Sequence, residues 1–376
     1  MLNRIQRMLV KEFLQMFRDP RMRAVIFGMP VIQLVVLSFT LTMDVTDIPT
    51  AVYDQDNSVA SRELAAQFGN SGYFEIEEYI HSRSRMVELL DTGDVRVIIR
   101  IPSGFEENLM KRTTARLQVI ADGTDSNTTS IVFGYMSQIV SQYNREKLQE
   151  RFVSLFGPQA LPGGIEIEQR AWYNENLESR YYYVPGLVGV MLILVSIVVA
   201  SIAIVREKEM GTIEQVMVTP IGKTEFILGK TVPYLITGYI IMAVMFAIAY
   251  LVFDIRIKGS IILLTVLTGV YLVGNLGIAL LISVTSRTQQ QALLTAFFVL
   301  MPAILLSGFI FPIHNMPAIV QYATYLNPMR WYMEVLRGVI LKGVGVHALA
   351  KAVLWQAILA VSFLLVAVSR FRKTLD

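Results

Sequence analysis

The chain has no cysteine, and this absence removes several kinds of chemistry at once. Without thiols a protein has no disulfide framework, no cysteine nucleophile, no iron–sulfur cluster and no thiolate ligand for a metal. Three histidines are present among 376 residues, and His81, His314 and His347 lie too far apart in the sequence to suggest a metal site. The sequence therefore predicts no metal centre and no catalytic constellation.

Charge is scarce as well. Only 17% of the residues are charged and 54% are hydrophobic, whereas a soluble domain is typically about 25% charged. This composition argues against an ordinary cytosolic enzyme, and it excludes a disordered chain, a collagen and a coiled coil.

Six stretches are long and apolar enough to cross a bilayer, which takes about 20 residues of helix. They are residues 23–43, 184–205, 231–253, 260–285, 291–311 and 350–369. The alternative, buried helices of a large globular protein, would show shorter runs and polar faces. Between their flanking charges these stretches contain no Asp, Glu, Lys, Arg or His, which disfavours ion-coupled transport because ion relays need ionisable groups in the spans.

The distribution of Lys and Arg predicts the orientation, because cytoplasmic segments carry the excess. With the N-terminus inside, the short segments on that side contain 14 Lys and Arg, against six on the other side. Both termini, the loop 206–230 and the tail 370–376 are therefore expected in the cytoplasm. Residues 1–22 have an amphipathic pattern that predicts a helix in the inner membrane interface, with a core-packed helix as the alternative.

Residues 44–183 are acidic, with 21 Asp and Glu against 13 Lys and Arg, while the rest of the chain has a net charge of +11. Runs typical of strands (50–53, 74–79, 95–101 and 117–121) alternate with helical spacing at 61–68, 84–90, 105–111 and 130–156. The predicted fold is an α-helical polytopic membrane protein, six helices with both termini inside, with an α/β extracytoplasmic domain inserted between the first two. Carboxylates such as Asp54 and Asp56 are expected to be solvated surface charges.

Nucleotide binding by this chain is not predicted. Gly222-Lys223-Thr224 resembles the end of a phosphate-binding loop, but the glycine that the motif needs five residues earlier is replaced by Met217.

The loop after the second span predicts a short helix that Pro220 terminates. Ile213, Val216 and Met217 share one face of this helix, and Glu207, Glu214 and Gln215 can present polar contacts. A short helix of mixed polarity is typical of a docking element. A solvated connector is an equally good interpretation on physical grounds alone.

After the fifth span, residues 312–347 are apolar but interrupted. Pro312, Pro317 and the pair Asn327-Pro328 break the helical pattern, which predicts two short re-entrant helices on the external side. They are candidates for an external gate, with ordinary loop packing as the alternative. The adjacent Trp331-Tyr332 is expected in an aromatic interface belt.

Three polar residues of the spans, Gln33, Asn275 and Ser283, are candidates for the substrate pathway. Hydrogen bonding between helices is the favoured interpretation of all three.

The order of these motifs resembles a known family. Arg206-Glu207…Gly211-Thr212-x-Glu214-Gln215…Thr219-Pro220 resembles the signature loop of type 2 ABC-transporter permeases of the export class. Lys11-Glu12 and Arg18-Asp19-Pro20-Arg21 resemble the family's entry helix, and Ile101-Pro102-x-Gly104-Phe105 and Leu326-Asn327-Pro328-Met329-Arg330 resemble its multidrug-export branch. The resemblance covers essentially the whole chain.

The resemblance implies a permease half in the bacterial inner membrane that pairs with a second copy or a paralogue. Two cytoplasmic ATPase subunits would use ATP and Mg²⁺, and this chain would bind no cofactor and no nucleic acid. A coupling helix over 207–218 would contact the ATPase. The implied contact residues are Arg206, Glu207, Gly211, Thr212, Glu214, Gln215 and Pro220.

The substrates expected from these features are amphipathic, drug-like or lipid-like, and the external domain could dock a periplasmic adaptor. Two other classes of function stay open: an ion-coupled carrier or channel, and a membrane anchor that transports nothing.

Overall fold

The structure, a computed structural model, describes residues 2–41, 45–111, 113–124, 126–157, 172–174, 178–211 and 222–370. The chain divides into two compact units. One comprises Met1–Thr42 and Arg170–Asp376 and is helical, and the other comprises Met43–Gln169 and contains a β-sheet. The predicted boundary at residue 183 is therefore too late, because Tyr183 is already part of the helical core.

The helical unit begins with α1 (Leu2–Arg18), which ends where Pro20 starts the short helix α2 (Pro20–Arg23). The π-helical turn η1 (Ala24–Gly28) and α3 (Met29–Thr40) follow. The carboxylate of Asp19 accepts a hydrogen bond from the N–H of Met22 at 3.4 Å, which satisfies one free donor at the start of α2. The helix is thus interrupted at Asp19, the residue before Pro20.

Four helices of the described chain are long and apolar enough to cross a membrane. They are the continuous 31-residue helix formed by α8 (Ser179–Leu194), η2 (Val195–Val199) and α9 (Ala200–Glu209), then α11 (Lys223–Phe253), α12 (Ile261–Thr285) and α16 (Ala350–Arg370). The first and fifth predicted spans correspond to shorter apolar helices, Ala24–Thr40 and α13 (Gln289–Leu305). Four of the six predicted spans thus coincide with helices that are long and apolar enough to cross a membrane, and the number of six spans stays a prediction.

Residues 312–347 form a turn η3 (Ile313–Asn315) and two short helices, as their interruptions predict. The first is α14 (Ala318–Ala323) with η4 (Thr324–Leu326), and the second is α15 (Pro328–Arg337) with η5 (Gly338–Lys342). α15 packs among α8, α12 and α16. Trp331 and Tyr332 are fully buried there, so the prediction of an interface belt is wrong for this pair. Tyr332 instead stacks on Tyr271 of α12, with ring centroids 4.0 Å apart.

Two glycines of α12 allow α16 to approach closely. A Cβ atom at Gly277 would lie 2.8 Å from the backbone nitrogen of Leu364 and 2.9 Å from the carbonyl carbon of Phe363. At Gly274 a Cβ would lie 3.3 Å from the Cα of Ala360. Small residues at such a contact let two helix backbones pack together inside a membrane.

The second unit is built on a four-stranded sheet in the order β2-β1-β3-β4. Its strands are β1 (Ile48–Asp54), β2 (Phe74–Tyr79), β3 (Val97–Ile101) and β4 (Gln118–Ala121). β1 pairs in parallel with β2 and β3, whereas β4 runs antiparallel to β3. All four predicted strands are confirmed.

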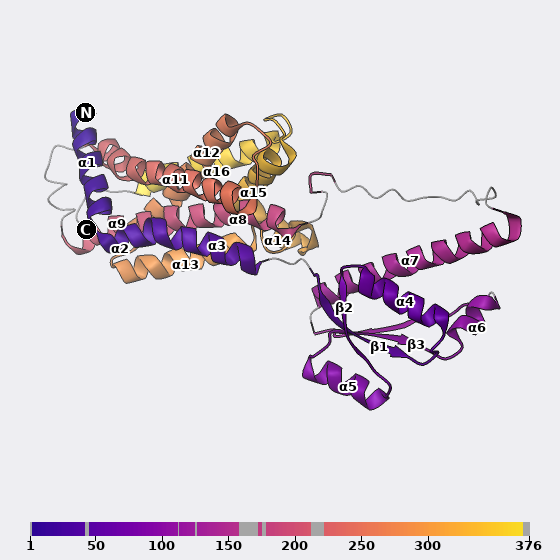
Figure 1. The fold of residues 1–376 in the computed structure, drawn as a ribbon. Coiled ribbons are helices and arrows are strands. Elements are labelled where there is room, and N and C mark those ends of the chain that lie inside the picture. Colours follow the sequence, from indigo (N-terminus) through magenta and orange to yellow (C-terminus); the bar gives the residue numbers. More distant parts are fainter. Residues whose placement is uncertain are drawn as a thin grey trace. The chain divides into compact units, whose positions relative to one another are not determined.

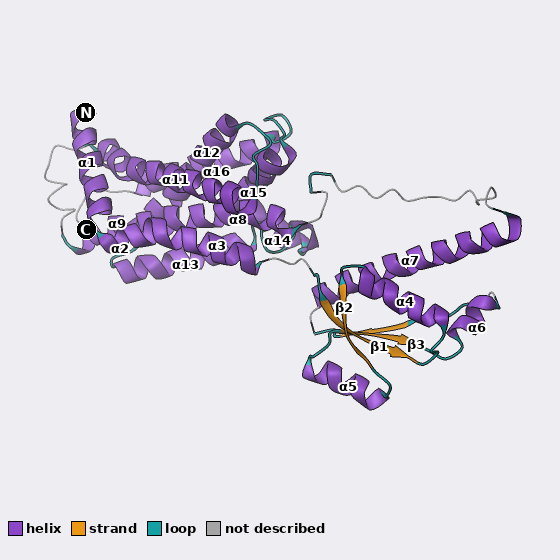
Figure 2. Ribbon diagram, in the orientation of Figure 1, coloured by secondary structure: helices purple, strands orange, loops and turns teal. Residues whose placement is uncertain are grey.

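Helices cover both faces of this sheet (Figure 2): α4 (Val59–Asn70) and α7 (Ser126–Phe156) lie on one face and α5 (Arg83–Thr92) on the other. Successive side chains of a strand point to opposite faces, so neighbouring residues join different cores. Ile99 packs in the core with Phe68 and Met136, and Ile98 packs with Leu89 of α5. The short helix α6 (Phe105–Met110) follows β3.

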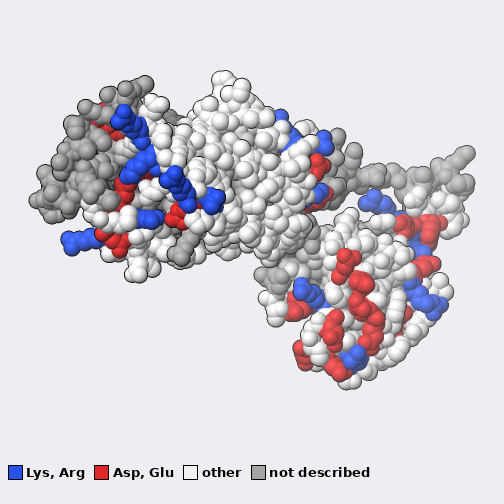
Figure 3. Space-filling model, turned by 60° about the vertical axis from the view of Figure 1, so that its left-hand side comes forward, with Lys and Arg blue, Asp and Glu red and all other residues white. Residues whose placement is uncertain are grey.

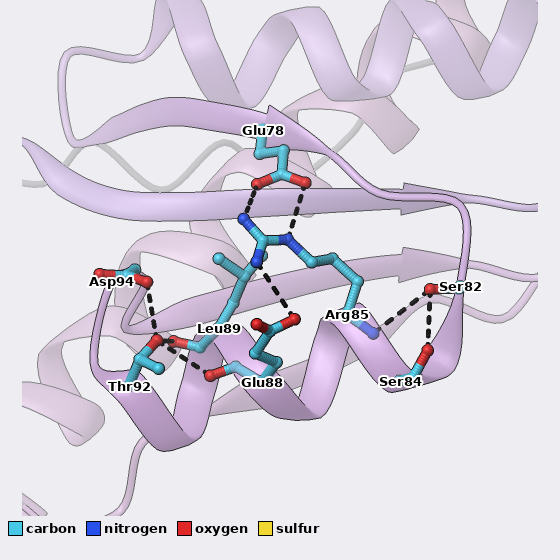
Figure 4. A network of polar contacts seen from close by, with 8 residues as sticks. All are labelled: Glu78, Ser82, Ser84, Arg85, Glu88, Leu89, Thr92 and Asp94. Atoms are coloured by element: carbon cyan, nitrogen blue, oxygen red, sulfur yellow. Dashed lines mark hydrogen bonds and ion pairs between the residues drawn. The ribbon is translucent and has the colours of Figure 1, made fainter.

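An arginine fastens α5 to the sheet (Figure 4). The guanidinium of Arg85 donates to both carboxylate oxygens of Glu78 on β2, at 3.1 and 2.9 Å, and contacts Glu88 at 3.2 Å. Ser82 caps the start of the helix by accepting from the N–H of Arg85 at 3.3 Å. Hydrogen bonds from Arg85 lower the pKa of Glu78 below its usual value, so the pair stays ionised at neutral pH.

Asp54 and Asp56 organise the loops at the end of β1. Asp54 accepts from the backbone of Asp56 at 2.9 Å and from the hydroxyl of Ser61 at 2.6 Å. Asp56 accepts from the N–H groups of Gly104, Phe105 and Glu106 at 2.7, 3.0 and 3.0 Å. The expectation of simple solvated charges is wrong for both carboxylates, because each one holds backbone donors of a neighbouring loop.

On the face of the helical unit drawn in Figure 3, charged side chains gather toward the two ends, and an uncharged band lies between them. The α/β unit presents many Asp and Glu side chains on the face drawn, in line with its acidic sequence. An uncharged band is what the hydrocarbon core of a bilayer requires, since a charge at its centre is costly.

Candidate coupling site

Four charged side chains meet where α1, α9 and α11 come together at one end of the helical unit (Figure 1). The ammonium of Lys230 on α11 lies 2.5 Å from Glu12 Oε1 on α1 and 2.6 Å from Glu207 Oε2 on α9. Lys11 donates to Glu207 Oε1 at 2.6 Å. We call Lys11, Glu12, Glu207 and Lys230 the charge cluster.

The charge cluster is balanced, and three of its four side chains are buried, while Lys11 is 49% exposed. Two cations face two carboxylates, and the side chains of Lys230, Glu12 and Glu207 are 1, 3 and 3% exposed. Removing one partner of a buried pair leaves an uncompensated charge in a poorly solvated place, which typically costs about 3–5 kcal/mol. The charge cluster therefore fixes α1 against α9 and α11.

The last turn of α9 also makes polar contacts with residues outside the charge cluster. Lys208 donates to the carbonyl of Ser286 at 3.0 Å, in the turn between α12 and α13. Glu209 accepts from the backbone and the side-chain amide of Gln289, the first residue of α13, at 3.1 and 2.9 Å. Arg206 approaches Asp19 at 3.5 Å, between α1 and α2. The end of α9 thus contacts three neighbouring parts of the helical unit.

Gly211 follows α9 with a backbone φ of +71°, a conformation that suits glycine because it has no Cβ. The N–H of Gly211 donates to the carbonyl of Lys208 at 3.2 Å, which closes the helix end. The predicted contact residues Thr212, Glu214, Gln215 and Pro220 lie outside the described residues. The chain is described again from Gly222, whose N–H donates to Glu225 at the start of α11.

The structure changes the expected role of Glu207. The sequence places this carboxylate on a surface that contacts a partner, but it is 2% exposed and turned toward Lys11 and Lys230. Glu207 therefore acts on the packing of the helices within this chain. Two other predicted coupling residues, Arg206 and Gly211, belong to the described part of the chain and lie close to Glu207 in the sequence.

Sequence analysis missed the charge cluster because the predicted spans stop short of it. The 31-residue helix that ends at Glu209 contains Glu207, and α11 starts at Lys223 and contains Lys230. The helices that contain the second and third predicted spans thus carry ionisable residues at their ends, so uncharged spans alone do not disfavour ion coupling. A signal was present in α1, where Glu12 falls on the same helical stripe as Met8 and Met16, both of which are buried.

The predicted gate residues lie at the ends of the short helices. Asn327 donates from its amide to the carbonyl of Ala303 in α13 at 2.7 Å, and its side-chain oxygen accepts from the N–H of Met329 at 3.0 Å. Pro328 is the first residue of α15, while Pro312 and Pro317 precede η3 and α14. Asn327 therefore links the end of α13 to the start of α15, and the gate itself stays a prediction.

The polar residues of the predicted pathway are not brought together by hydrogen bonds. Ser283 donates to the carbonyl of Leu280 in its own helix at 2.7 Å, so an interhelical bond is wrong for this residue. Asn275 is fully buried in α12 and makes no interhelical hydrogen bond with another described residue. Gln33 lies on α3 and is half-buried.

Comparison with known proteins identifies the family. Residues 20–369 match the family described as ABC-2 family transporter protein. The chain belongs to this family. The probable multidrug ABC transporter permease YbhR of Escherichia coli K12 is 33% identical over 342 residues, which cover 91% of each chain.

Two further relatives come from the same organism. The probable multidrug ABC transporter permease YbhS is 28% identical and covers 99% of this chain and 98% of its own. The inner membrane transport permease YhhJ is 24% identical over 94% of this chain and 95% of its own. The chain is therefore a multi-pass permease subunit of an ABC transporter, in which ATP hydrolysis belongs to a separate subunit.

Proposed function

We propose that this permease is one half of an ATP-driven exporter in the bacterial inner membrane, with six spans and both termini in the cytoplasm. It moves amphipathic, drug-like or lipid-like substrates out of the cytoplasm or the inner leaflet. The names of two relatives describe those proteins as probable multidrug transporter permeases. The uncharged band of the helical unit supports a pathway for apolar molecules. The α/β unit lies on the external side, where a periplasmic adaptor can dock.

Energy reaches the permease through segment 206–220. The observation that carries this proposal is the fastening of the end of α9 to α1, α11 and the start of α13. These contacts are polar and hold the end of α9 to its neighbours. A movement of the chain at Gly211 is therefore transmitted to α1, α11 and α13 together. ATP and Mg²⁺ are bound by a pair of partner ATPases, and a second copy or a paralogue completes the pathway.

The coupling proposal is tested at Gly211. A β-branched residue is strained at a positive φ, so Gly211→Val should reorient the segment that follows α9. We expect at least a tenfold loss of transport, together with weaker copurification of the ATPase, and only a small change in the melting temperature.

The matched control is Gly345→Val, in a loop where an added Cβ meets no atom within 4 Å. If Gly211→Val transports and retains its ATPase as well as Gly345→Val does, segment 206–220 does not couple the two subunits.

A further inference from the structure

A groove on the helical unit runs between three helices. Val273 and Leu276 of α12 form its floor, and α11 and α16, which both pack on α12, form its walls. The cavity measures about 300 Å³ and is lined by apolar side chains except for two threonines of α11. The hydroxyl of one of them, Thr231, donates to the carbonyl of Ile227 within its own helix at 2.8 Å, so it demands no polar ligand.

The length of the groove matches one leaflet of a bilayer. Its lining residues on α11 run from Thr224 to Leu235 at helical spacing and so form one continuous face. Eleven steps of about 1.5 Å span roughly 16 Å along the helix. Half of the hydrocarbon core of a bilayer is about 15 Å thick, so the groove is long enough to take up most of one acyl chain.

One end of the groove lies toward the end of the helical unit that holds the charge cluster, and two exposed arginines follow or precede residues packed there. Arg370, the last residue of α16, is exposed and lies two residues beyond Val368 in the groove wall. Arg7 of α1 is also exposed, and its neighbour Met8 packs in a small core with Ala367 of α16.

Among the described residues, the carboxylates at this end are engaged by protein partners, Asp19 by Arg206 and Glu209 by Gln289. Glu12 and Glu207 are buried in ion pairs with lysine, and Glu225 is buried at the start of α11. In the part of the chain that the structure describes, the exposed charge next to the groove wall is therefore positive.

We propose that this groove holds one acyl chain of an anionic phospholipid, with the phosphate beside Arg7 and Arg370. The apolar walls alone give little selectivity, because lipid tails are as apolar as the side chains that line the groove. Preference comes from the headgroup, since each basic side chain near an anionic membrane surface strengthens binding by roughly fivefold.

The test uses the full chain in nanodiscs that contain equal amounts of phosphatidylglycerol and phosphatidylethanolamine. Native mass spectrometry then counts the lipids that stay bound after detergent release. Leu228→Trp fills the groove, whose wall includes Leu228. Leu251→Trp is the matched control, because Leu251 lies on the same helix, is 78% exposed and is absent from the groove lining.

Wild type and Leu251→Trp should retain phosphatidylglycerol at least fivefold over phosphatidylethanolamine, and Leu228→Trp should lose at least fivefold of it. The double variant Arg7→Gln/Arg370→Gln changes only exposed residues and should hold both lipids equally. Equal retention by Leu228→Trp and Leu251→Trp, no headgroup preference in the wild type, or detergent as the retained mass would each overturn the proposal.

Discussion

Single residues decide how the end of α9 is held. Glu207 and Lys230 each stand next to an apolar run, and their burial depends on oppositely charged partners from distant parts of the chain. Sequence reasoning placed Glu207 at a helix end but could not see that Lys11 and Lys230 would reach it. Glu207 lies 196 positions from Lys11 and on a different helix from Lys230, so neither ion pair leaves a local pattern to find.

The charge cluster should show a large penalty when one member is removed. Lys230→Met leaves a net negative charge among buried groups, and we expect it to destabilise the helical unit by about 3–5 kcal/mol. Thermal unfolding of the detergent-purified chain, followed by tryptophan fluorescence, measures this loss.

The double variant Lys230→Met/Glu12→Gln restores neutrality and keeps the pair of Lys11 with Glu207, so it should recover more than half of the loss. Lys111→Met serves as the surface control, because Lys111 and Glu107 form an exposed pair worth less than about 1 kcal/mol. If the double variant is no more stable than Lys230→Met, charge balance does not determine the stability of the charge cluster.

Asp56 makes a pH-dependent contribution to the α/β unit. Partial burial raises its pKa, but hydrogen bonds from Ser58 and from the N–H groups of residues 104–106 outweigh this, and the net pKa lies below the usual 3.8. A carboxyl group with a depressed pKa stabilises the fold above its unfolded pKa and loses this effect as the pH falls through its folded pKa.

Asp56→Asn replaces one accepting oxygen by an NH2 group, so it should cost about 1 kcal/mol, the net worth of one hydrogen bond, at pH 5 to 7 and progressively less below about pH 4. Hydrogen exchange at the amides of residues 104–106 in the full chain should accelerate in parallel at neutral pH. Asp91→Asn on the exposed face of α5 is the control. A penalty that is the same at pH 3 and pH 7 would contradict this role.

Elements were predicted well wherever local periodicity carries the signal. All four strands of the α/β unit and the helices α4, α5, α6 and α7 lie where alternation and helical spacing place them. Element ends were predicted less well. α11 begins at Lys223 and not at residue 231, because a charged residue that is neutralised inside the fold does not stop a helix.

The environment of the short helix α15 was predicted wrongly as well. Trp331 and Tyr332 have the amphipathic character of interface residues, but α15 is enclosed by other helices and its aromatic rings are part of the core. Composition cannot distinguish a ring at the membrane surface from a ring that stacks on Tyr271 in the interior.

The contact of α12 with α16 should be intolerant of even one methyl group. Gly277→Ala would place a Cβ 2.8 Å from a backbone atom of α16, and a backbone cannot turn aside as a side chain can. We expect a loss of about 1–3 kcal/mol, typical of overpacking, in thermal unfolding of the helical unit. Gly134→Ala in α7 meets no atom within 4 Å and should be neutral or slightly stabilising.

For the whole molecule, the absence of cysteine gives a direct measurement of topology. Met110 is 73% exposed in the α/β unit, and Arg287 is exposed in the turn between α12 and α13. In sealed spheroplasts a membrane-impermeant maleimide should label Met110→Cys at once and Arg287→Cys only after permeabilisation. The parent chain supplies a background without any thiol, and the reverse labelling order would invert the proposed orientation.

The edges of the sheet have a consequence for many copies in one membrane. β2 and β4 are the outer strands, and unpaired backbone groups on such strands can recruit a strand from a neighbouring molecule. Here β4 is only four residues long, and β2 presents the exposed carboxylates of Glu75 and Glu77. Two copies that met along β2 would bring like charges together, so crowding should not lead to aggregation through these strands.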